Sequence, residues 1–551
     1  MIKKILISME DNSPSSVSDK IVSVIEQSTT DDELTSLQEE TDNSLEESNV
    51  LLSDVGNATD ELKILEDANN VLKEQLNSGD SEPVDEVALE LLKLKSVYIE
   101  DRWGLKVFNK KTISTEDFSE LSTSSKVSET KELVESLDEG LSSSSDLVSK
   151  GSIVAVDGII DSLKKLALKA FSQNNKTVIE AIDWDVTPGS GFIINDPIIL
   201  SLLNEETDEV SVVNLMKSLE RVKSVISESF TDTLFSKLDS YFENPTQFNP
   251  FDVLREIFKK GEDGHLSAGH KHLKLADCSI GGDNLIAILG GGEDESTGLI
   301  IEKEDGAVTP VNLSVPNKAD VLALIDELNE IKKIVLENLE KTDALQCKVR
   351  NCLQNHPLET CPVLVRLSTL LPEWIVKGVA KLISAINEFI IRSAESSQLG
   401  VGQLDESLLD QELVRQENDS LEAQEQELRE QTLFADSLYQ AAGDIAHTEE
   451  LKAVIDNEIQ NDRPVSKLAV ELYISSVKGV CKRWGFPTKD ISNISLESLS
   501  VGTYNQRLEN LKSALEDFHS TMNKALAYVG EAIMRTILWL KNAWEVFTDT
   551  S

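Results

Sequence analysis

The sequence predicts a mainly α-helical protein, built from duplicated helical bundle units with a small α+β insert in the middle. Only 26 glycines and 13 prolines occur in 551 residues, which favours helices over a fold with many turns. Apolar residues recur at steps of three and four in several segments, which is the helical period. One stretch of the sequence also recurs 381 residues later, which indicates an internal repeat.

The repeat is clearest around two Arg-Trp-Gly triplets, Arg102-Trp103-Gly104 and Arg483-Trp484-Gly485. A gapless window of 34 residues from Pro83 and Pro464 contains eleven identities. Unrelated sequences of this composition would share about two. Each copy reads as a helix that begins near the proline and ends at the tryptophan.

Residues around the triplets predict how each copy folds. Gly104 and Gly485 fit the left-handed position that ends a helix. Ser114 and Ser495 are the serines of two Ile-Ser-x-Glu sequences and are predicted to be N-caps of the next helix, although the acid comes one residue too early for a complete capping box. We expect both tryptophan rings to pack in a core rather than to bind a ligand.

Four amphipathic helices are predicted from apolar stripes. Two of them close the repeat copies, one follows Pro316-Asn317, and one lies near residue 380. Each stripe can face its own bundle core or form a self-assembly surface. The stripes are Ile153, Val156, Ile159, Leu163, Leu166 and Ala170; Val529, Ile533, Ile537, Leu540, Trp544 and Phe547; Leu324, Leu328, Ile331 and Val335; and Ile375, Val379, Leu382, Ile386 and Phe389.

Between residues 184 and 316 the pattern changes to short apolar runs typical of strands, at 192–194, 285–289, 299–301 and 311–315. Asp305-Gly306 is a hairpin-like turn signal between the last two runs. Helices are expected at about 209–229 and 231–242.

These patterns divide the chain into six segments. They are an acidic arm or propeptide (1–82), repeat copy one (83–183), the α+β insert (184–316), a helical segment (317–395), an acidic linker or helix (396–460) and repeat copy two (461–551). The two acidic segments have few periodic apolar residues, so we expect solvated helix or partial disorder there.

Composition excludes several functions. With 52 Lys+Arg against 98 Asp+Glu, the net charge is −46 and the pI about 4.5. Such a surface repels nucleic-acid phosphates and anionic membranes, so we expect neither as a partner. The apolar run at the N-terminus ends at Glu10, too early for a secretory signal. Five cysteines are few and odd in number, which favours reduced thiols in a cytosol-like compartment.

The sequence has no legible active site, and we expect neither an enzyme nor a cofactor. Cys347, Cys352, His356 and Cys361 form the only metal-like cluster, and a weak one, because zinc sites usually separate two ligand pairs. Buried thiols are the simpler reading. His265, His270 and His272 are expected in an exposed polar loop. The triglycine at 290–292 precedes three acids and is expected to be a loop rather than a phosphate site.

Taken together, the repeat and the acidic and apolar segments resemble the internal head (prohead core or inner body) proteins of giant myoviruses. The resemblance is carried by the helix through Glu90 or Glu471 to Arg-Trp-Gly, the Ser-x-Glu that follows, and the closing apolar helices. It covers most of 83–171 and 464–547.

The resemblance implies trimming by a head maturation protease, which favours a small residue, any residue, then Glu. Candidate cleavages follow Glu395, Glu46, Glu422 and Glu10, because polar segments can enter a protease cleft. It also implies a non-enzymatic phage structural protein that self-associates and binds other capsid or core proteins, first in the host cytoplasm and then inside the virion. The alternatives are an acidic helical interaction module, tail-associated or for host takeover, and an enzyme hidden in the insert.

Overall fold

The protein is described here from a computed structural model, in which the chain divides into two compact units. Unit 1 comprises residues 1–59 and 145–403, and unit 2 comprises residues 60–144 and 404–551. The boundaries fall inside two long helices, α3 (Asp31–Ser78) and α6 (Thr123–Ser172). The structure describes residues 31–78, 86–108, 123–172, 176–181, 184, 191–194, 198–200, 212–258, 263–265, 271–276, 279–289, 296–303, 311–398, 440–458, 460–461 and 465–484.

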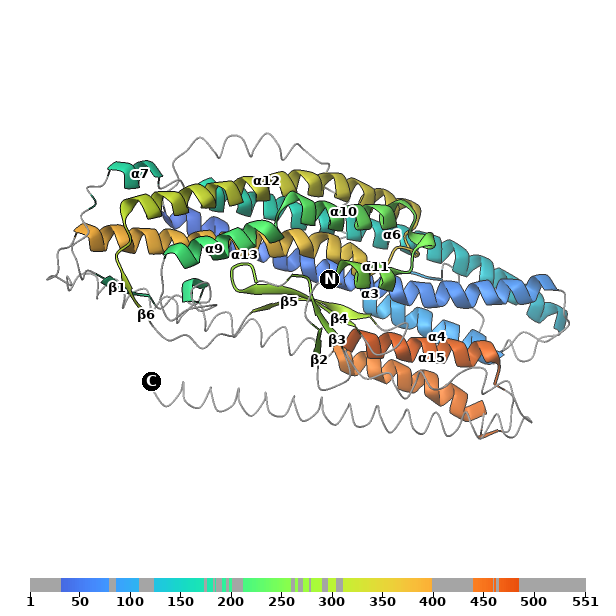
Figure 1. The fold of residues 1–551 in the computed structure, drawn as a ribbon. Helices are drawn as coiled ribbons and strands as arrows, with labels where there is room; N and C mark the ends of the chain where they lie inside the picture. The colour runs from blue at the N-terminus through green and yellow to red at the C-terminus, as the bar shows by residue number, and fades with distance from the viewer. Residues whose placement is uncertain are drawn as a thin grey trace, which may run out of the picture. The chain divides into compact units, whose positions relative to one another are not determined.

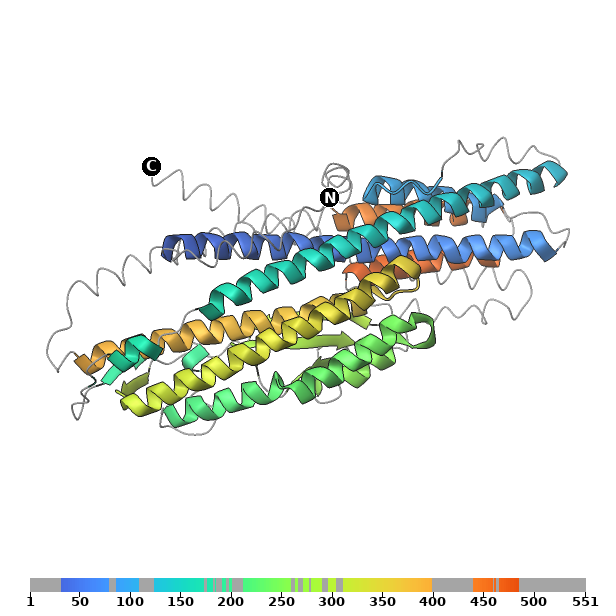
Figure 2. The same ribbon diagram turned by 90° about the horizontal axis from the view of Figure 1, so that it is seen from above.

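Helices dominate both units, which confirms the predicted mainly α fold. In unit 1, α12 (Lys318–Asn355) packs against α13 (Pro362–Gln398). Asn317 caps the start of α12, because its side chain accepts a hydrogen bond from the Asp320 amide at 2.9 Å. The predicted stripes of both helices are buried throughout. Seen from above, α12 lies between α13 on one side and α9 (Val212–Val225) with α10 (Glu228–Glu243) on the other (Figure 2).

The unit 1 portions of α3 and α6 also contact this core. Their apolar side chains are buried, and polar side chains beside them form ion pairs and hydrogen bonds with α12 and α13. Val156, Ile159, Leu163 and Leu166 of α6 are buried as predicted. Arg350 of α12 pairs with Asp157 of α6 at 2.6 Å. Asn49 of α3 donates to the Glu373 carboxylate of α13 at 3.2 Å, so the unit 1 portions of both α3 and α6 contact the α12–α13 core.

The predicted α+β insert is present within unit 1 (Figure 1). Strands β2 (Asp263–His265), β3 (Lys271–Lys274), β4 (Asp283–Leu289) and β5 (Ser296–Lys303) form one antiparallel sheet, and β1 (Gly191–Ile194) pairs with β6 (Val311–Ser314). The short helices η1 (Pro245–Gln247) and α11 (Pro250–Ile257) also belong to this segment, and α7 (Lys176–Ala181) precedes it. The four predicted strand runs and both predicted helices match β1, β4, β5, β6, α9 and α10.

The hairpin predicted at Asp305-Gly306 is wrong. The strands on either side belong to different sheets, since β5 pairs with β4 and β6 pairs with β1. Residues 304–310 themselves lie outside the described part of the chain.

A tight contact fixes the sheet to α13. The indole of Trp374 donates to the Asp283 carbonyl at 2.8 Å, and Lys381 pairs with the Asp283 carboxylate at 2.6 Å. Gly281, with φ of 59°, and Gly378 let the two backbones approach, because a Cβ on Gly378 would lie 2.4 Å from the Ile280 carbonyl oxygen. The strand therefore docks at one position along the helix.

Unit 2 contains residues 60–78 of α3, α4 (Glu86–Trp103), residues 123–144 of α6, a helix over 440–458, and α15 (Lys467–Trp484). Helices α4 and α15 pack against each other. Gly104 has φ of 74° and its amide bonds to the Glu100 carbonyl, which confirms the predicted left-handed helix end. Gly485, Ser114, Ser495 and the closing helix of copy two lie outside the described residues.

Much of the first acidic segment is packed rather than solvated. Leu45, Leu51 and Val55 on α3 are buried in unit 1, and Leu62, Leu65 and Leu72 are buried in unit 2. The helical part of the expectation is confirmed for 31–78, but its solvated character is wrong for these positions. In the second acidic segment, 440–458 is a helix with a buried face.

Within the part of the chain that the structure describes, none of the helices combines the length and the apolar character needed to cross a membrane.

Gly378→Ala should destabilise unit 1 by about 1–3 kcal/mol, because the added methyl meets backbone atoms that cannot turn away. The matched control is Gly443→Ala in the 440–458 helix, where an added Cβ would meet nothing within 4 Å. That change should stabilise by about 0.4–1 kcal/mol. Urea unfolding of the three proteins measures both effects, and a neutral Gly378→Ala would contradict the close contact.

Candidate functional site

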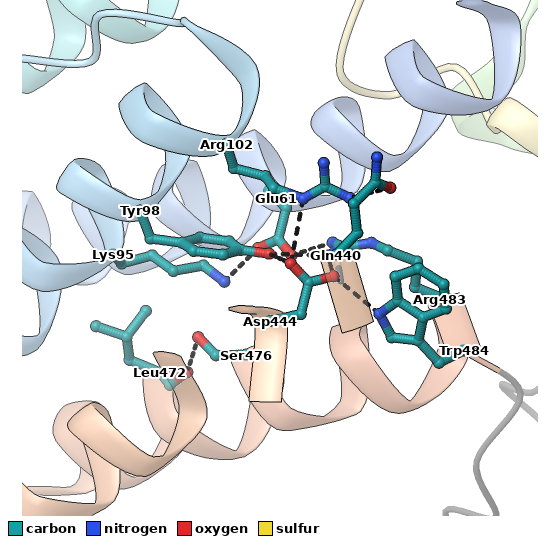
Figure 3. A network of polar contacts seen from close by, with 10 residues as sticks. All are labelled: Glu61, Lys95, Tyr98, Arg102, Gln440, Asp444, Leu472, Ser476, Arg483 and Trp484. Carbon is teal, nitrogen blue, oxygen red and sulfur yellow. Dashed lines mark hydrogen bonds and ion pairs between the residues drawn. The ribbon is translucent and has the colours of Figure 1, made fainter. Parts of the chain in front are cut away.

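The candidate site is a buried cluster of charged groups in unit 2, which we call the ion cluster (Figure 3). It comprises Glu61, Lys95, Tyr98, Arg102, Asp444 and Arg483. These residues come from four helical segments: α3, α4, the 440–458 helix and α15. Each segment contributes through its buried face, so the cluster lies among apolar side chains such as Leu62 and Leu472.

Glu61 forms one half of the ion cluster. Its carboxylate pairs with Lys95 of α4 and with Arg483 of α15. Burial by itself would raise the pKa of Glu61, but the charges of Lys95 and Arg483 outweigh it and hold that pKa below its ordinary value. Glu61 therefore stays ionised inside the unit.

Asp444 forms the other half, with both carboxylate oxygens occupied. Oδ1 accepts from the Tyr98 hydroxyl at 2.6 Å and from Arg102 at 3.2 Å. Oδ2 accepts from Arg483 at 2.7 Å and from the Trp484 indole at 2.8 Å. Burial opposes ionisation of Asp444, but Arg483, Tyr98 and Arg102 together lower its pKa.

The buried charges balance. Glu61, Asp444, Lys95 and Arg483 give two negative and two positive groups, all with side chains at most 6% exposed. Arg102 adds a fifth charge but is 18% exposed and also donates to Gln440 at 2.9 Å. Tyr98 joins the two halves, because it donates to Asp444 and accepts from Arg483 at 2.8 Å.

His447 closes one side of the ion cluster as a neutral ring. It is 4% exposed and stacks on Tyr98, with ring centroids 4.1 Å apart and planes 3° from parallel. Its Nε2 makes no hydrogen bond to any described residue. Burial, followed by the nearby Lys95 charge, lowers the pKa of His447 from 6.5 to about 3.

The two repeated tryptophans occupy different surroundings. Trp103 is buried as predicted, and its ring contacts the guanidinium groups of Arg102 at 4.4 Å and Arg483 at 5.4 Å. Trp484 is half-buried and bonds to Asp444 through its indole nitrogen. Core packing is therefore confirmed for Trp103, which also lies against two guanidinium groups, whereas Trp484 is only half-buried.

The weak metal candidates are not brought together. Cys347 is exposed, whereas Cys352 is buried with its sulfur 3.2 Å from the Thr360 hydroxyl. Cys361 is half-buried, and its amide bonds to Tyr241. His356 ends α12 as its C-cap. Among the described residues, no three His, Cys, Asp or Glu side chains are placed to hold a metal ion.

The histidine loop was predicted wrongly for two of its three residues. His265 and His272 stand on the paired strands β2 and β3, where His272 lies opposite Gly264. His270 and the triglycine lie outside the described residues.

Two of the predicted cleavage positions lie within helices rather than in polar arms. Glu46 is exposed on α3, next to the buried Leu45. Glu395 is in α13, directly after the buried Ser393 and Ala394. Cleavage at either position requires local unfolding of a packed helix. Glu10 and Glu422 lie outside the described residues.

Sequence reasoning found part of the ion cluster and missed its acids. The repeat singled out Arg102, Trp103, Arg483 and Trp484. It did not single out Glu61 or Asp444, which are two of 98 acidic residues. The only available signal was helical spacing, which places Asp444 on the same face as Ile445, His447 and Leu451.

Comparisons of the chain with protein-family models, with curated proteins and with solved structures give no match. The fold and the ion cluster are therefore interpreted from their own physical chemistry.

Trp103→Ala should destabilise unit 2 by about 3–5 kcal/mol, because it removes a buried ring. Trp484→Ala should cost less, about 1–3 kcal/mol, because the ring is half-buried. Trp484→Phe keeps a smaller aromatic ring and loses the bond to Asp444, so its comparison with Trp484→Ala separates the ring's packing from the loss of the indole nitrogen. Chemical denaturation measures all three, and equal losses for both alanine variants would contradict their different surroundings.

Acid should weaken unit 2 beginning near pH 6.5. The folded state holds the pKa of His447 at about 3, below its ordinary 6.5, so the unfolded state binds more protons. The contribution of His447 to the free energy of unfolding is therefore fully present above pH 6.5. It decreases by up to about 1.4 kcal/mol per pH unit as the pH falls towards 3. Glu61 and Asp444 act in the same direction below about pH 4.5, since their folded pKa values are also lowered.

His447→Phe keeps the stacking on Tyr98 but cannot take up a proton. Urea unfolding between pH 7 and 5, with hydrogen exchange read in α4 and α15, should show a flatter pH dependence for this variant. An unchanged slope would mean that His447 is not the titrating group.

Proposed function

We propose that this chain is a non-enzymatic structural protein packaged inside a phage capsid as an internal head or prohead core component. The observation that carries the proposal is a net charge of −46 on a chain built from long helices. Such a charge keeps a protein soluble at high density and repels rather than clamps DNA. The resemblance of the repeated segments to internal head proteins supports the same function.

The chemistry of the ion cluster also supports a structural function. A general base or nucleophile needs a lone pair that can reach a substrate. In the ion cluster both carboxylates are occupied by cations and hydroxyl or indole groups, and His447 is buried. These groups hold helices together rather than facing a substrate.

Packing between helices supplies the proposed mechanism of assembly. Buried stripes hold each unit together, whereas single apolar side chains such as Val97, Val154 and Ile391 remain exposed on helices. Weak contacts between many copies, together with mutual charge repulsion, would give a dense but reversible core. The expected partners are further copies, other capsid or core proteins, and the maturation protease.

Mass spectrometry of purified phage particles tests the proposal. Peptides from this chain should be present and should survive treatment of intact particles with external protease, because the capsid encloses them. If trimming occurs, new termini should not follow Glu46 or Glu395, which lie in packed helices. A chain found in infected cells but missing from particles would contradict the capsid function and favour the helical interaction module.

A further inference from the structure

The ion cluster joins two parts of the chain that lie far apart in sequence. One is residues 60–78 of α3 together with α4, which we call the N-terminal pair. The other is the 440–458 helix together with α15, which we call the C-terminal pair. Residues 104–439 lie between them in sequence and include most of unit 1, so unit 2 is assembled from segments that do not follow each other.

Buried polar contacts connect the two pairs. Glu61 of the N-terminal pair binds Arg483 of the C-terminal pair. Asp444 of the C-terminal pair accepts hydrogen bonds from Tyr98 at 2.6 Å and from Arg102 at 3.2 Å, both on α4. Figure 3 shows these side chains meeting between the blue ribbons of the N-terminal pair and the orange ribbons of the C-terminal pair. Each pair therefore places an acid beside donors of the other.

Packing extends the contact beyond the charges. His447 of the C-terminal pair stacks on Tyr98 of α4, with ring centroids 4.1 Å apart. Gly479 of α15 lies against α3, because a Cβ added there would be 3.6 Å from Ile64 and 3.8 Å from Glu61. Helices α4 and α15 also pack directly against each other. The two pairs thus meet through apolar, aromatic and charged groups together.

Each pair also has an internal ion pair. Glu61 binds Lys95 within the N-terminal pair. Asp444 binds Arg483 at 2.7 Å and the Trp484 indole at 2.8 Å within the C-terminal pair. These contacts position each acid for its contact with the other pair.

We propose that the contact between the two pairs is a noncovalent clasp: the C-terminal pair stays bound to the N-terminal pair when the chain is cut between residues 399 and 439, and mild acid releases it. A cut in that stretch would therefore leave two fragments in one complex. The inference does not rest on the capsid function, because it uses only contacts within unit 2.

Cutting the chain removes none of these contacts. It removes only the high effective concentration that one continuous chain gives to its two parts. Burial of the apolar faces of α4 and α15 still favours association. The buried charges then select the register, because an alternative register would leave Glu61 or Asp444 without a cation.

His447 is the group through which acid opens the clasp. When the pairs separate, its ring meets water and takes up a proton at its ordinary pKa of 6.5, whereas in the clasp burial and Lys95 hold that pKa at about 3. Lowering the pH from 7 to 5 should therefore weaken binding about twentyfold. The titratable groups around His447 are Lys95 and Tyr98 of α4, Glu61 of α3, Arg483 of α15, and Asp444 and Glu450 of its own helix.

The two buried acids do not oppose this release. The pKa values of Glu61 and Asp444 are both held below their ordinary values by the neighbouring cations. Both acids therefore remain ionised in the clasp at pH 5, and His447 accounts for the difference between pH 7 and pH 5.

A protease site engineered between residues 405 and 435 of the full-length protein tests the clasp. After cleavage at pH 7, the two fragments should elute together in size-exclusion chromatography at about 1 μM, and dilution in an analytical ultracentrifuge then gives the Kd. Fragments of the otherwise unaltered protein that separate at this concentration overturn the proposal.

Matched substitutions on α15 show whether the ion cluster holds the fragments. Arg483→Ala should raise the Kd at least about a hundredfold, because it leaves buried carboxylates without their shared cation. Lys478→Ala removes the same charge from an exposed position and should change the Kd by less than about threefold. Equal Kd values for these two variants would place the contact elsewhere and overturn the proposal.

Arg483→Lys guards against a variant that fails to fold. It keeps the positive charge but lacks the planar fork that reaches both acids, so its Kd should lie between those of the unaltered protein and Arg483→Ala. Circular dichroism of each uncut variant checks that its helices form. A Kd for Arg483→Lys equal to that of the unaltered protein contradicts the bridging contact.

Repeating the measurement at pH 5 tests release by acid. The Kd of the cleaved, otherwise unaltered protein should rise about twentyfold between pH 7 and pH 5, whereas His447→Phe should abolish most of this rise. An equal rise in both proteins overturns the assignment of acid release to His447.

Discussion

Two carboxylates removed from water impose the main constraint on unit 2. Glu61 and Asp444 lie inside a helical layer, where an uncompensated charge would cost several kcal/mol. Each is therefore held by cations from two helices, and this requirement fixes which helices meet and at which level. Apolar stripes alone allow more than one register between two helices, because one leucine layer can take the place of the next when a helix shifts along its partner by one turn. A buried acid that must meet an arginine removes such alternatives, so the ion cluster contributes specificity to a core whose stability comes from apolar burial.

In unit 1, different buried polar groups fix the register between packed elements. Trp374 and Lys381 on α13 both bind Asp283, and the close approach at Gly378 fixes the strand against the helix. Asn49 of α3 likewise donates to the buried Glu373 of α13 at 3.2 Å. In both units, long helices receive their apolar contacts from regular stripes and their register from a few buried polar groups. A cooperative and uniquely packed fold is the expected result.

The net charge of the whole chain differs from the charge balance inside unit 2. Over the whole chain, 98 acidic residues against 52 basic ones give a net charge of −46, and a charge of this size makes copies of a protein repel one another. Inside unit 2, the two acids and the two bases of the ion cluster that are most deeply buried are paired with one another. The ion cluster links α3 and α4 to the 440–458 helix and α15, which come from distant parts of the sequence.

The sequence by itself determined whatever depends on local spacing. Apolar stripes at helical period located α12, α13 and the unit 1 part of α6, Asn317 marked a helix start, and Gly104 marked a helix end. The repeat singled out both arginines and both tryptophans of the ion cluster. Tertiary structure decided the rest, because it depends on contacts between distant residues. The partner of β6 is β1, more than a hundred residues earlier, so a turn signal next to β6 could not identify it. The stripe on α3 was hidden among acids that face outward. Asp444 and Glu61 look like any other acidic residue until the fold places Arg102 and Arg483 from other helices beside them.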